Sequence, residues 1–323
     1  MPANPQPRLA LVLLIVGLFA LILSACIAPQ SAAAPSDPTT QLTLAGAPAP
    51  PAALLAHMAD SETLSTLSDA VVFESINDVR RLQQGIESGQ IHAGMASTSA
   101  LAVLRNQGVP IQLVDVFGWG LLHILSGEKE IDSWENLRGS KIAMPYRGSV
   151  GDVIFAGLAA EAGMSLGDDL VMRYASNPLE AAEVLLGKQV QAAVLGEPWA
   201  SVAIDRGFEE DEPIHRVMDV QSEWGAFFDT PPRIPQVGFF VTDALATDHP
   251  EIVTALRQSL GEAAAWAEAN PDDAAAVAAE LTRLSQTVTA ESLAHTQLNV
   301  ISAQEARLEL EQLFTRLAAA NPD

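Results

Sequence analysis

Three structural signals follow one another in the segment Trp134-Glu-Asn-Leu-Arg-Gly-Ser-Lys-Ile-Ala-Met-Pro-Tyr-Arg-Gly-Ser-Val-Gly-Asp152. A short helical turn is predicted first, ended by Gly139, and residues 141–144 then predict a buried strand. The loop at 145–149 must turn sharply, and Ser149 can cap a helix whose apolar residues recur at helical spacing. In an open α/β sheet such a loop, between a strand end and a helix start, is where ligands bind. The alternative is an ordinary connection between a strand and a helix, in which Gly and Pro only make the turn.

Composition limits the classes of function. The chain has 323 residues, of which 49% are hydrophobic, enough to build one large or two medium domains. Seventeen basic residues stand against 40 acidic ones, and the formal net charge of -23 argues against a nucleic-acid partner. An anion site in this chain must therefore rely on local donors that act against an unfavourable overall field.

The amino terminus has the pattern of an export signal. Arg8 precedes an apolar run at 9–22 that is short for a membrane span of about 20 residues. Leu23-Ser-Ala-Cys26 resembles a bacterial lipobox, whose Cys carries the lipid, and Cys26 is the only cysteine, so no disulfide can form within the chain. We expect a lipoprotein signal peptide over 1–26 and a flexible Ala-, Pro- and Ser-rich tether over 27–40. An uncleaved amino-terminal anchor is the alternative.

Other strand ends carry further candidate ligand loops. The first strand ends at Gly46, and the third leads into Ser97-Thr98-Ser99, hydroxyl residues that either cap a helix or bind a ligand. A later strand enters Gly196-Glu-Pro-Trp199, where Glu197 is either a helix-start charge, worth about 0.3 to 1 kcal/mol, or an acceptor for a ligand N–H.

The chain alternates strands and helices up to residue 241, and from residue 248 onward we expect helices. Trp119 stands between two glycines, which indicates a bend where the chain leaves one lobe for another, and residues 234–241 predict the return. Trp119 and Trp199 each either line the cleft between the lobes or pack beneath it.

A family resemblance supports the ligand-loop interpretation. The run Asn136-Leu-Arg-Gly-Ser-Lys-Ile-Ala-Met-Pro145, followed by a Gly-Ser loop and a helix, resembles the start of the second lobe in ABC-importer solute-binding proteins of the nitrate, sulfonate, taurine and thiamine-pyrimidine type. Strand ends at Gly46, Ser97 and Glu197-Pro198 occur in the matching order, and the resemblance covers about residues 42–267.

The resemblance implies an α/β fold with the two-lobed architecture of type II periplasmic binding proteins, in which two crossover strands form a hinge. Lobe I would comprise 41–118 plus 238–323, and lobe II would comprise 119–237. The implied protein is a monomer, lipid-anchored through Cys26 on the extracytoplasmic face of a bacterial membrane, that uses no cofactor and delivers a solute to the permease and ATPase of an ABC importer.

The expected solute is a small organic anion or a heteroaromatic compound. Arg147 together with the loop hydroxyls suits a sulfonate or carboxylate, whereas Tyr146 and the two tryptophans suit a flat ring. The residues expected to bind the ligand are Gly46, Ser97, Thr98, Trp119, Tyr146, Arg147, Gly148, Ser149, Glu197 and Trp199.

Signatures of enzymes and metal sites are absent from the sequence. It has no Gly-rich dinucleotide or phosphate motif, no His-Glu-x-x-His and no Gly-x-Ser-x-Gly. None of its six histidines lies three or four residues from another, so we expect no metal ligand and no catalytic residue. A surface lipoprotein that acts as a sensory or partner-binding module on the same fold is the second hypothesis, and an enzyme of that fold is the third.

Overall fold

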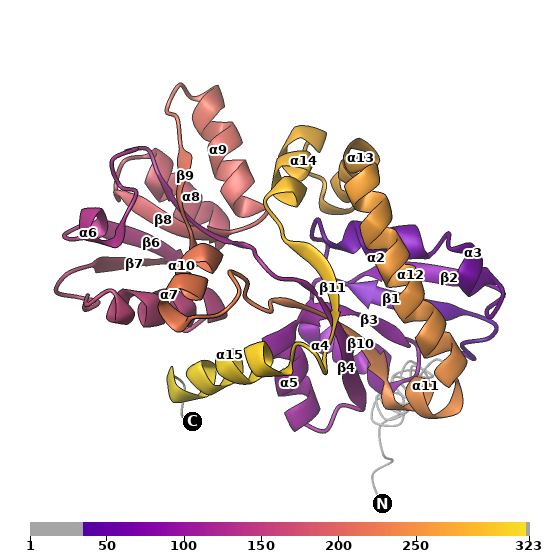
Figure 1. Ribbon diagram of the computed structural model, residues 1–323. Coiled ribbons are helices and arrows are strands. Elements are labelled where there is room, and N and C mark those ends of the chain that lie inside the picture. The colour runs from indigo at the N-terminus through magenta and orange to yellow at the C-terminus, as the bar shows by residue number, and fades with distance from the viewer. Residues whose placement is uncertain (1–34, 321–323) are drawn as a thin grey trace, which may run out of the picture. The chain divides into compact units, whose positions relative to one another are not determined.

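The computed structural model describes residues 35–320, and the described residues from Ser36 onward belong to one compact unit (Figure 1). The expected signal peptide and Cys26 lie outside the described residues. Among the helices of the described part, none is long and apolar enough to cross a membrane.

A first sheet holds six strands in the order β11-β4-β10-β3-β1-β2. Its strands are β1 (Leu42–Gly46), β2 (Val71–Ser75), β3 (Ala93–Ser97), β4 (Ile111–Gly118), β10 (Val237–Thr242) and β11 (Leu298–Ser302). Strands β1, β2 and β3 pair in parallel, whereas β10 runs antiparallel to both β3 and β4. The carboxyl ends of β1, β3 and β4 therefore lie at one edge of this sheet.

A second sheet holds five strands in the order β7-β6-β8-β5-β9. Its strands are β5 (Leu122–Ser126), β6 (Lys141–Pro145), β7 (Val171–Ala175), β8 (Ala192–Gly196) and β9 (His215–Asp219). Strand β6 pairs in parallel with β7 and β8, and β5 is antiparallel to β8 and β9. The strands of the two sheets confirm the expected α/β class.

Helices cover both faces of each sheet. On the first sheet they are α2 (Ala52–Met58), α3 (Glu62–Ser65), α4 (Val79–Glu87), α5 (Thr98–Asn106), α11 (Asp243–Asp248), α12 (Pro250–Ala269) and α13 (Pro271–Thr282). On the second they are α6 (Trp134–Leu137), α7 (Val150–Glu161), α8 (Pro178–Leu186), α9 (Trp199–Glu209) and α10 (Val220–Phe228). Two further helices, α14 (Gln286–Ala294) and α15 (Arg307–Ala320), follow α13 in the chain.

Successive side chains along a strand pack into separate hydrophobic cores on the two faces of the sheet. On β10, Phe239 joins the cluster beneath α2 and α12, while its neighbour Phe240 joins the opposite cluster beneath α4 and α5. On β6, Ile142 packs with α7 and α10, while Ala143 packs with α8 and α9. Because both faces of each sheet are covered, residues that point to either face are apolar, and the buried strands are nearly continuous apolar runs in the sequence.

Three segments run side by side where the chain passes between the sheets. The N–H of Ile234 donates to the carbonyl of Trp119 (2.6 Å), and the N–H of Gln236 donates to that of Gly118 (2.9 Å), so the outward and return passages are hydrogen-bonded to each other. Gln297, just before β11, bonds to the same bend, because its carbonyl accepts from the Trp119 N–H at 2.9 Å. The sequence predicted two crossover strands, and this third segment was not foreseen.

Several elements differ from the sequence predictions. Residues 36–40, assigned to the tether, bond to the domain, for example through the N–H of Ser36 to the carbonyl of Gly89 (3.1 Å). The region after residue 248 also contains a strand, β11, which pairs with β4. Helix α15 contacts α7 and places Leu313 in the core of the second sheet, while its Leu310 packs with Val116 of β4. The division into lobes stays a prediction.

A buried imidazole fixes the first described residues. The Nδ1 atom of His92 accepts the N–H of Thr43 (3.1 Å), and its Nε2 lies 3.0 Å from the carbonyl oxygen of Ser36, to which it donates in the neutral form. Burial lowers the pKa of His92, against the smaller raising effect of the hydrogen bond to Ser36. Protonation of Nδ1 would break the bond from Thr43.

We expect acid to weaken this attachment. Because the folded pKa of His92 lies below its ordinary value of about 6.5, His92 contributes stability above that pH, and the contribution is lost as the pH falls below it. Urea unfolding of the wild type should therefore lose free energy between about pH 6.5 and 5 more steeply than unfolding of His92→Gln. His215→Gln, which also removes one imidazole, is the control, and equal slopes in wild type and His92→Gln would refute this role.

Candidate functional site

The loop-bearing edges of the two sheets face each other. At the edge of the first sheet, Gly118 and Ser97 both pair with Val237, and at the edge of the second, Gly196 pairs with Leu122. The chain passes from Gly118 to Leu122 through three residues, and four Cα steps span at most about 15 Å. The carboxyl ends of the parallel strands in both sheets are thus brought close together.

A cavity of about 680 Å³ lies between α4 and α5 on one side and the β6–α7 turn on the other. Small-molecule sites usually have volumes of about 300 to 1,000 Å³. Leu317 of α15 adds to the wall of the cavity. The residues that line it are Val79, Arg80, Gln83, Ser99, Ala100, Val103, Leu104, Gln107, Gly148, Ser149, Val150 and Leu317. We refer to this space as the α5–α7 cavity.

The described lining of the α5–α7 cavity carries no negative side chain. Among the described residues that line it, none is Asp or Glu, although the chain has 40 of them, and one is a cation, Arg80. The first turns of α4, α5 and α7 all contribute to the lining, through residues such as Val79, Ser99 and Val150. A helix start carries unpaired N–H donors and about half a positive charge.

Sequence-encoded caps set these helix starts. The Oγ of Ser97 accepts from the N–H of Ala100 (3.1 Å) and the Oγ of Ser149 accepts from the N–H of Asp152 (3.3 Å), which confirms both residues as N-caps. Tyr146 and Gly148 have positive φ angles (55° and 77°), and this double left-handed turn lets the chain reverse directly from β6 into α7.

Part of the lining of the α5–α7 cavity is apolar. Val79 and Val103 are each 53% exposed, and with Val150 and Leu317 they form an open hydrophobic wall beside the helix starts. A solute with one anionic end and a short apolar body matches both parts of the lining.

Comparison with known proteins identifies the family. The family described as NMT1/THI5 like matches residues 70–274, which is more than half of the chain. The chain belongs to the NMT1/THI5-like family. No curated protein sequence matches it.

Solved structures of other proteins share the fold of this NMT1/THI5-like chain. An ABC transporter structure from Parabacteroides distasonis has a TM-score of 0.69 at 16% identity, covering 88% of this chain and 94% of that one. The periplasmic aliphatic sulphonate binding protein SsuA from Escherichia coli has a TM-score of 0.66 at 17% identity, and the match covers 85% of this chain and 91% of SsuA. The periplasmic nitrate-binding protein NrtA from Synechocystis PCC 6803 has a TM-score of 0.61 at 14% identity, and the match covers 88% of this chain and 81% of NrtA. The predicted two-lobed binding-protein fold is thereby confirmed.

The sequence-predicted site residues are not all brought together in this NMT1/THI5-like chain. Gly148 and Ser149 line the α5–α7 cavity, and Tyr146 beside them is 53% exposed. Ser97 lies next to the cavity, where its Oγ is 3.2 Å from that of Ser99. Thr98 is buried, and its hydroxyl donates to the carbonyl of Pro235 (2.7 Å), so it ties α5 to the returning passage.

The remaining predicted residues lie elsewhere. Gly46 ends β1 in the core, Trp199 begins α9, and Trp119 is 1% exposed with its indole N–H donated to the carbonyl of Asn299 (2.6 Å). The guanidinium of Arg147 lies 5.2 Å from the centre of the Tyr174 ring and lines a different cavity. None of these four lines the α5–α7 cavity.

Glu197 is the centre of a buried ionic cluster. Its side chain is 1% exposed, and its Oε1 accepts from Arg216 at 2.6 and 3.1 Å. Its Oε2 accepts from the N–H and the hydroxyl of Ser201 (3.2 and 2.7 Å). The carboxylate is thus occupied by protein donors in this conformation, which agrees with the helix-start alternative for Glu197.

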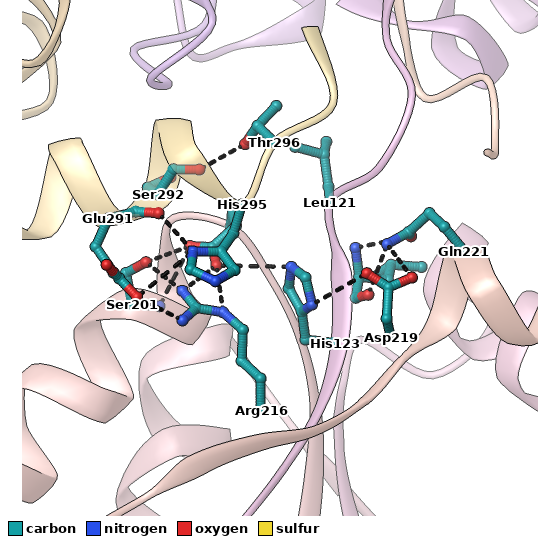
Figure 2. Close-up of polar contacts among 12 residues, drawn as sticks. Leu121, His123, Ser201, Arg216, Asp219, Gln221, Glu291, Ser292, His295 and Thr296 are labelled. Carbon is teal, nitrogen blue, oxygen red and sulfur yellow. Dashed lines mark hydrogen bonds and ion pairs between the residues drawn. The ribbon is translucent and has the colours of Figure 1, made fainter. Parts of the chain in front are cut away.

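Arg216 links this cluster to α14. Figure 2 shows Arg216 directed toward Glu291 of α14, to which it donates at 2.9 Å, while it also donates to the hydroxyl of Ser201 (2.8 Å). His123 and His295 approach edge to face, with ring centres 6.0 Å apart. The cluster therefore joins β5, β9 and α9 of the second sheet to the segment after α13.

His123 is buried beside Glu197 without a full set of partners. It is 2% exposed, its Nε2 lies 3.7 Å from Oε1 of Glu197, and this Nε2 has no hydrogen-bond partner within the described part of the chain. Burial lowers the pKa of His123, while Glu197 opposes the shift. No group of three or more His, Cys, Asp or Glu among residues 35–320 could hold a metal ion.

The sequence did not identify Arg80, Gln83, Gln107 or Leu317 as lining residues. Arg80 and Gln83 lie on α4, Gln107 directly follows α5 and Leu317 lies on α15, and no local motif marks them. The signal that could have drawn attention to Ser99 is its position two residues after the Ser97 cap, in the first turn of α5.

Proposed function

We propose that the chain is the solute-binding component of an ABC importer of the sulfonate and nitrate class. The observation that carries the proposal is the α5–α7 cavity, whose described lining includes residues from three helix starts and Arg80 but no carboxylate, in a chain of net charge -23. Membership of the NMT1/THI5-like family and a fold shared with the sulphonate-binding protein SsuA and the nitrate-binding protein NrtA support it. The chain binds its solute and carries out no chemistry on it.

The proposed solute is a small organic anion, with a sulfonate or carboxylate at the helix starts and a short apolar body against Val103, Val150 and Leu317. Micromolar capture requires about 8 kcal/mol, and one hydrogen bond to a charged group supplies about 1.5 to 3 kcal/mol. Arg80, the serine hydroxyls and the helix N–H groups would thus act together. The anion is favoured over a heteroaromatic ring because Trp119 is covered by the protein itself.

The proposed setting is the extracytoplasmic face of a bacterial membrane. In this view a lipid on Cys26 would hold a monomeric domain near the permease and ATPase that receive the solute. The lipobox-like sequence and the apolar run before it support the anchor.

Native mass spectrometry of the domain from Ser36 onward, purified without the lipid, tests the proposal. A co-purified small molecule, or a rise in unfolding temperature with short sulfonates or carboxylates, is the expected result. A domain that carries no solute and is not stabilised by any short anion would instead favour a sensory or partner-binding module. Turnover of an added solute would contradict the binding-only role.

A further inference from the structure

A second cavity, of about 550 Å³, lies on the other side of the β6–α7 turn, among α7, α10 and α15. Its lining comprises Arg147, Gly148, Asp152, Val153, Ile154, Ala156, Gly157, Leu166, Tyr174, Trp224, Leu313, Arg316, Leu317, Ala319 and Ala320. We refer to it as the α7–α15 cavity. It shares Gly148 and Leu317 with the α5–α7 cavity and is otherwise lined by different residues.

Two guanidinium groups converge on the α7–α15 cavity. Arg147 lies over the ring of Tyr174, and Arg316 lies 3.6 Å from the centre of the Phe228 ring and 5.4 Å from that of Trp224. Within the part of the chain that the structure describes, neither Arg147 nor Arg316 pairs with a carboxylate. A guanidinium stacked on a ring keeps its in-plane N–H groups free for a planar acceptor.

The single carboxylate in the lining forms hydrogen bonds with other groups. Asp152 is 7% exposed, its Oδ2 accepts the N–H of Gly148 (2.8 Å), and its Oδ1 accepts the hydroxyl of Tyr174 (3.2 Å). Both oxygens are therefore used to hold the β6–α7 turn against β7. This contrasts with Arg216 and Arg257, whose guanidinium groups are bonded to buried acids.

The rest of the lining is apolar, and there is free space beside α7. Val153, Ala156, Leu166 and Leu313 contribute aliphatic surface from three directions. Gly157, in the middle of α7, has no atom within 4 Å of the position that a Cβ would take, so this turn of the helix opens into free space. A hydrocarbon chain can extend along α7 from the two arginines.

We propose that the α7–α15 cavity is a second binding site, for an amphipathic organic anion. Its carboxylate or sulfonate pairs with Arg147 and Arg316, and its aliphatic chain lies along α7 over Gly157. The site differs from the α5–α7 cavity in having two cations, Arg147 and Arg316, and in lying along α7 over Gly157.

Isothermal titration with decanoate, below its micelle-forming concentration, tests the proposal, with decanol as the uncharged comparison. Gly157→Leu fills the cavity from its floor, and we expect it to weaken decanoate binding at least tenfold. Gly261→Leu in α12 is the matched control, because Gly261 is also a helix glycine with free space around its Cβ position but lies outside the cavity. Thermal unfolding checks that both variants fold.

Removing the two positive charges gives an independent test of the site. Arg147→Gln combined with Arg316→Gln should weaken decanoate at least tenfold, whereas Arg283→Gln, at the end of α13, should not. Decanoate binding that survives both Gly157→Leu and the double arginine variant, or decanol binding as tightly as decanoate, would overturn the site. Absence of decanoate binding to the wild type would also overturn it.

This test is separable from that of the proposed function. The proposed site for a short anion such as ethanesulfonate is the α5–α7 cavity, which Gly157 does not line, so ethanesulfonate binding should be unchanged by Gly157→Leu. Wild-type protein that binds ethanesulfonate but not decanoate would reject the second site alone, and wild-type protein that binds decanoate but not ethanesulfonate would reject the proposed function alone.

Discussion

Arg216→Ala is expected to lower the free energy of unfolding by about 3 to 5 kcal/mol, the cost of leaving a buried charge without its partner. The side chain of Glu197 is 1% exposed and that of Arg216 is 12% exposed, so the substitution leaves a buried carboxylate without its ion-pair partner. The substitution also removes the bonds to Ser201 and Glu291 and so loosens α14 from the second sheet. Urea unfolding followed by circular dichroism measures the change.

Two variants show whether the effect comes from the buried charge. Arg138→Ala removes an exposed guanidinium that pairs with Asp169 and should cost at most about 1 kcal/mol. Arg216→Met combined with Glu197→Gln removes both charges and keeps an acceptor for Ser201, so it should lose less stability than Arg216→Ala alone. A cost for Arg216→Ala no larger than that for Arg138→Ala would show that Glu197 is not held by this ion pair.

Ser149→Asp is expected to weaken the binding of a short organic anion by about 100-fold. The substitution keeps the N-cap of α7, because Asp caps helices as well as Ser does. It adds a negative charge to a lining that has no acidic side chain. Two like charges about 6 Å apart repel by about 3 kcal/mol at an effective dielectric constant near 20, which corresponds to about 100-fold in affinity.

A second N-cap provides the control. Ser285 caps α14 in the same way, with its Oγ accepting the N–H of Val288 (3.2 Å), and it does not line the α5–α7 cavity. Ser285→Asp should leave the affinity within about twofold of the wild type. Titration calorimetry with ethanesulfonate measures both variants, and equal affinities for Ser149→Asp and Ser285→Asp would place the anion elsewhere.

The order of elements could be predicted from sequence because local signals mark it. Apolar runs with Gly, Pro or Ser at their ends predicted the parallel strands, and Ser97 and Ser149 predicted the starts of α5 and α7. Strand β11 could not be predicted in this way. Leu298–Ser302 is a partly exposed edge strand, and it becomes a strand through its pairing with β4, about 180 residues earlier in the chain.

The site was predicted in part for a similar reason. Gly148 and Ser149 lie on a loop whose local sequence indicates a strand-to-helix turn, and the structure places both in the α5–α7 cavity. Arg80 and Leu317 reach the same space from distant helices, which only tertiary packing brings together. Glu197 showed a helix-start position in the sequence, but its partner Arg216 is 19 residues away and no spacing rule connects the two.

The titration of ethanesulfonate, ethanol and ethylamine into the wild-type domain tests the central claim most directly. The three compounds have the same apolar body and differ in the charge of the head group. If the helix starts and Arg80 form an anion site in the α5–α7 cavity, ethanesulfonate binds with a dissociation constant in the micromolar range, and the other two bind at least 100-fold more weakly. Equal binding of all three, or tighter binding of ethylamine, would contradict an anion site in this cavity.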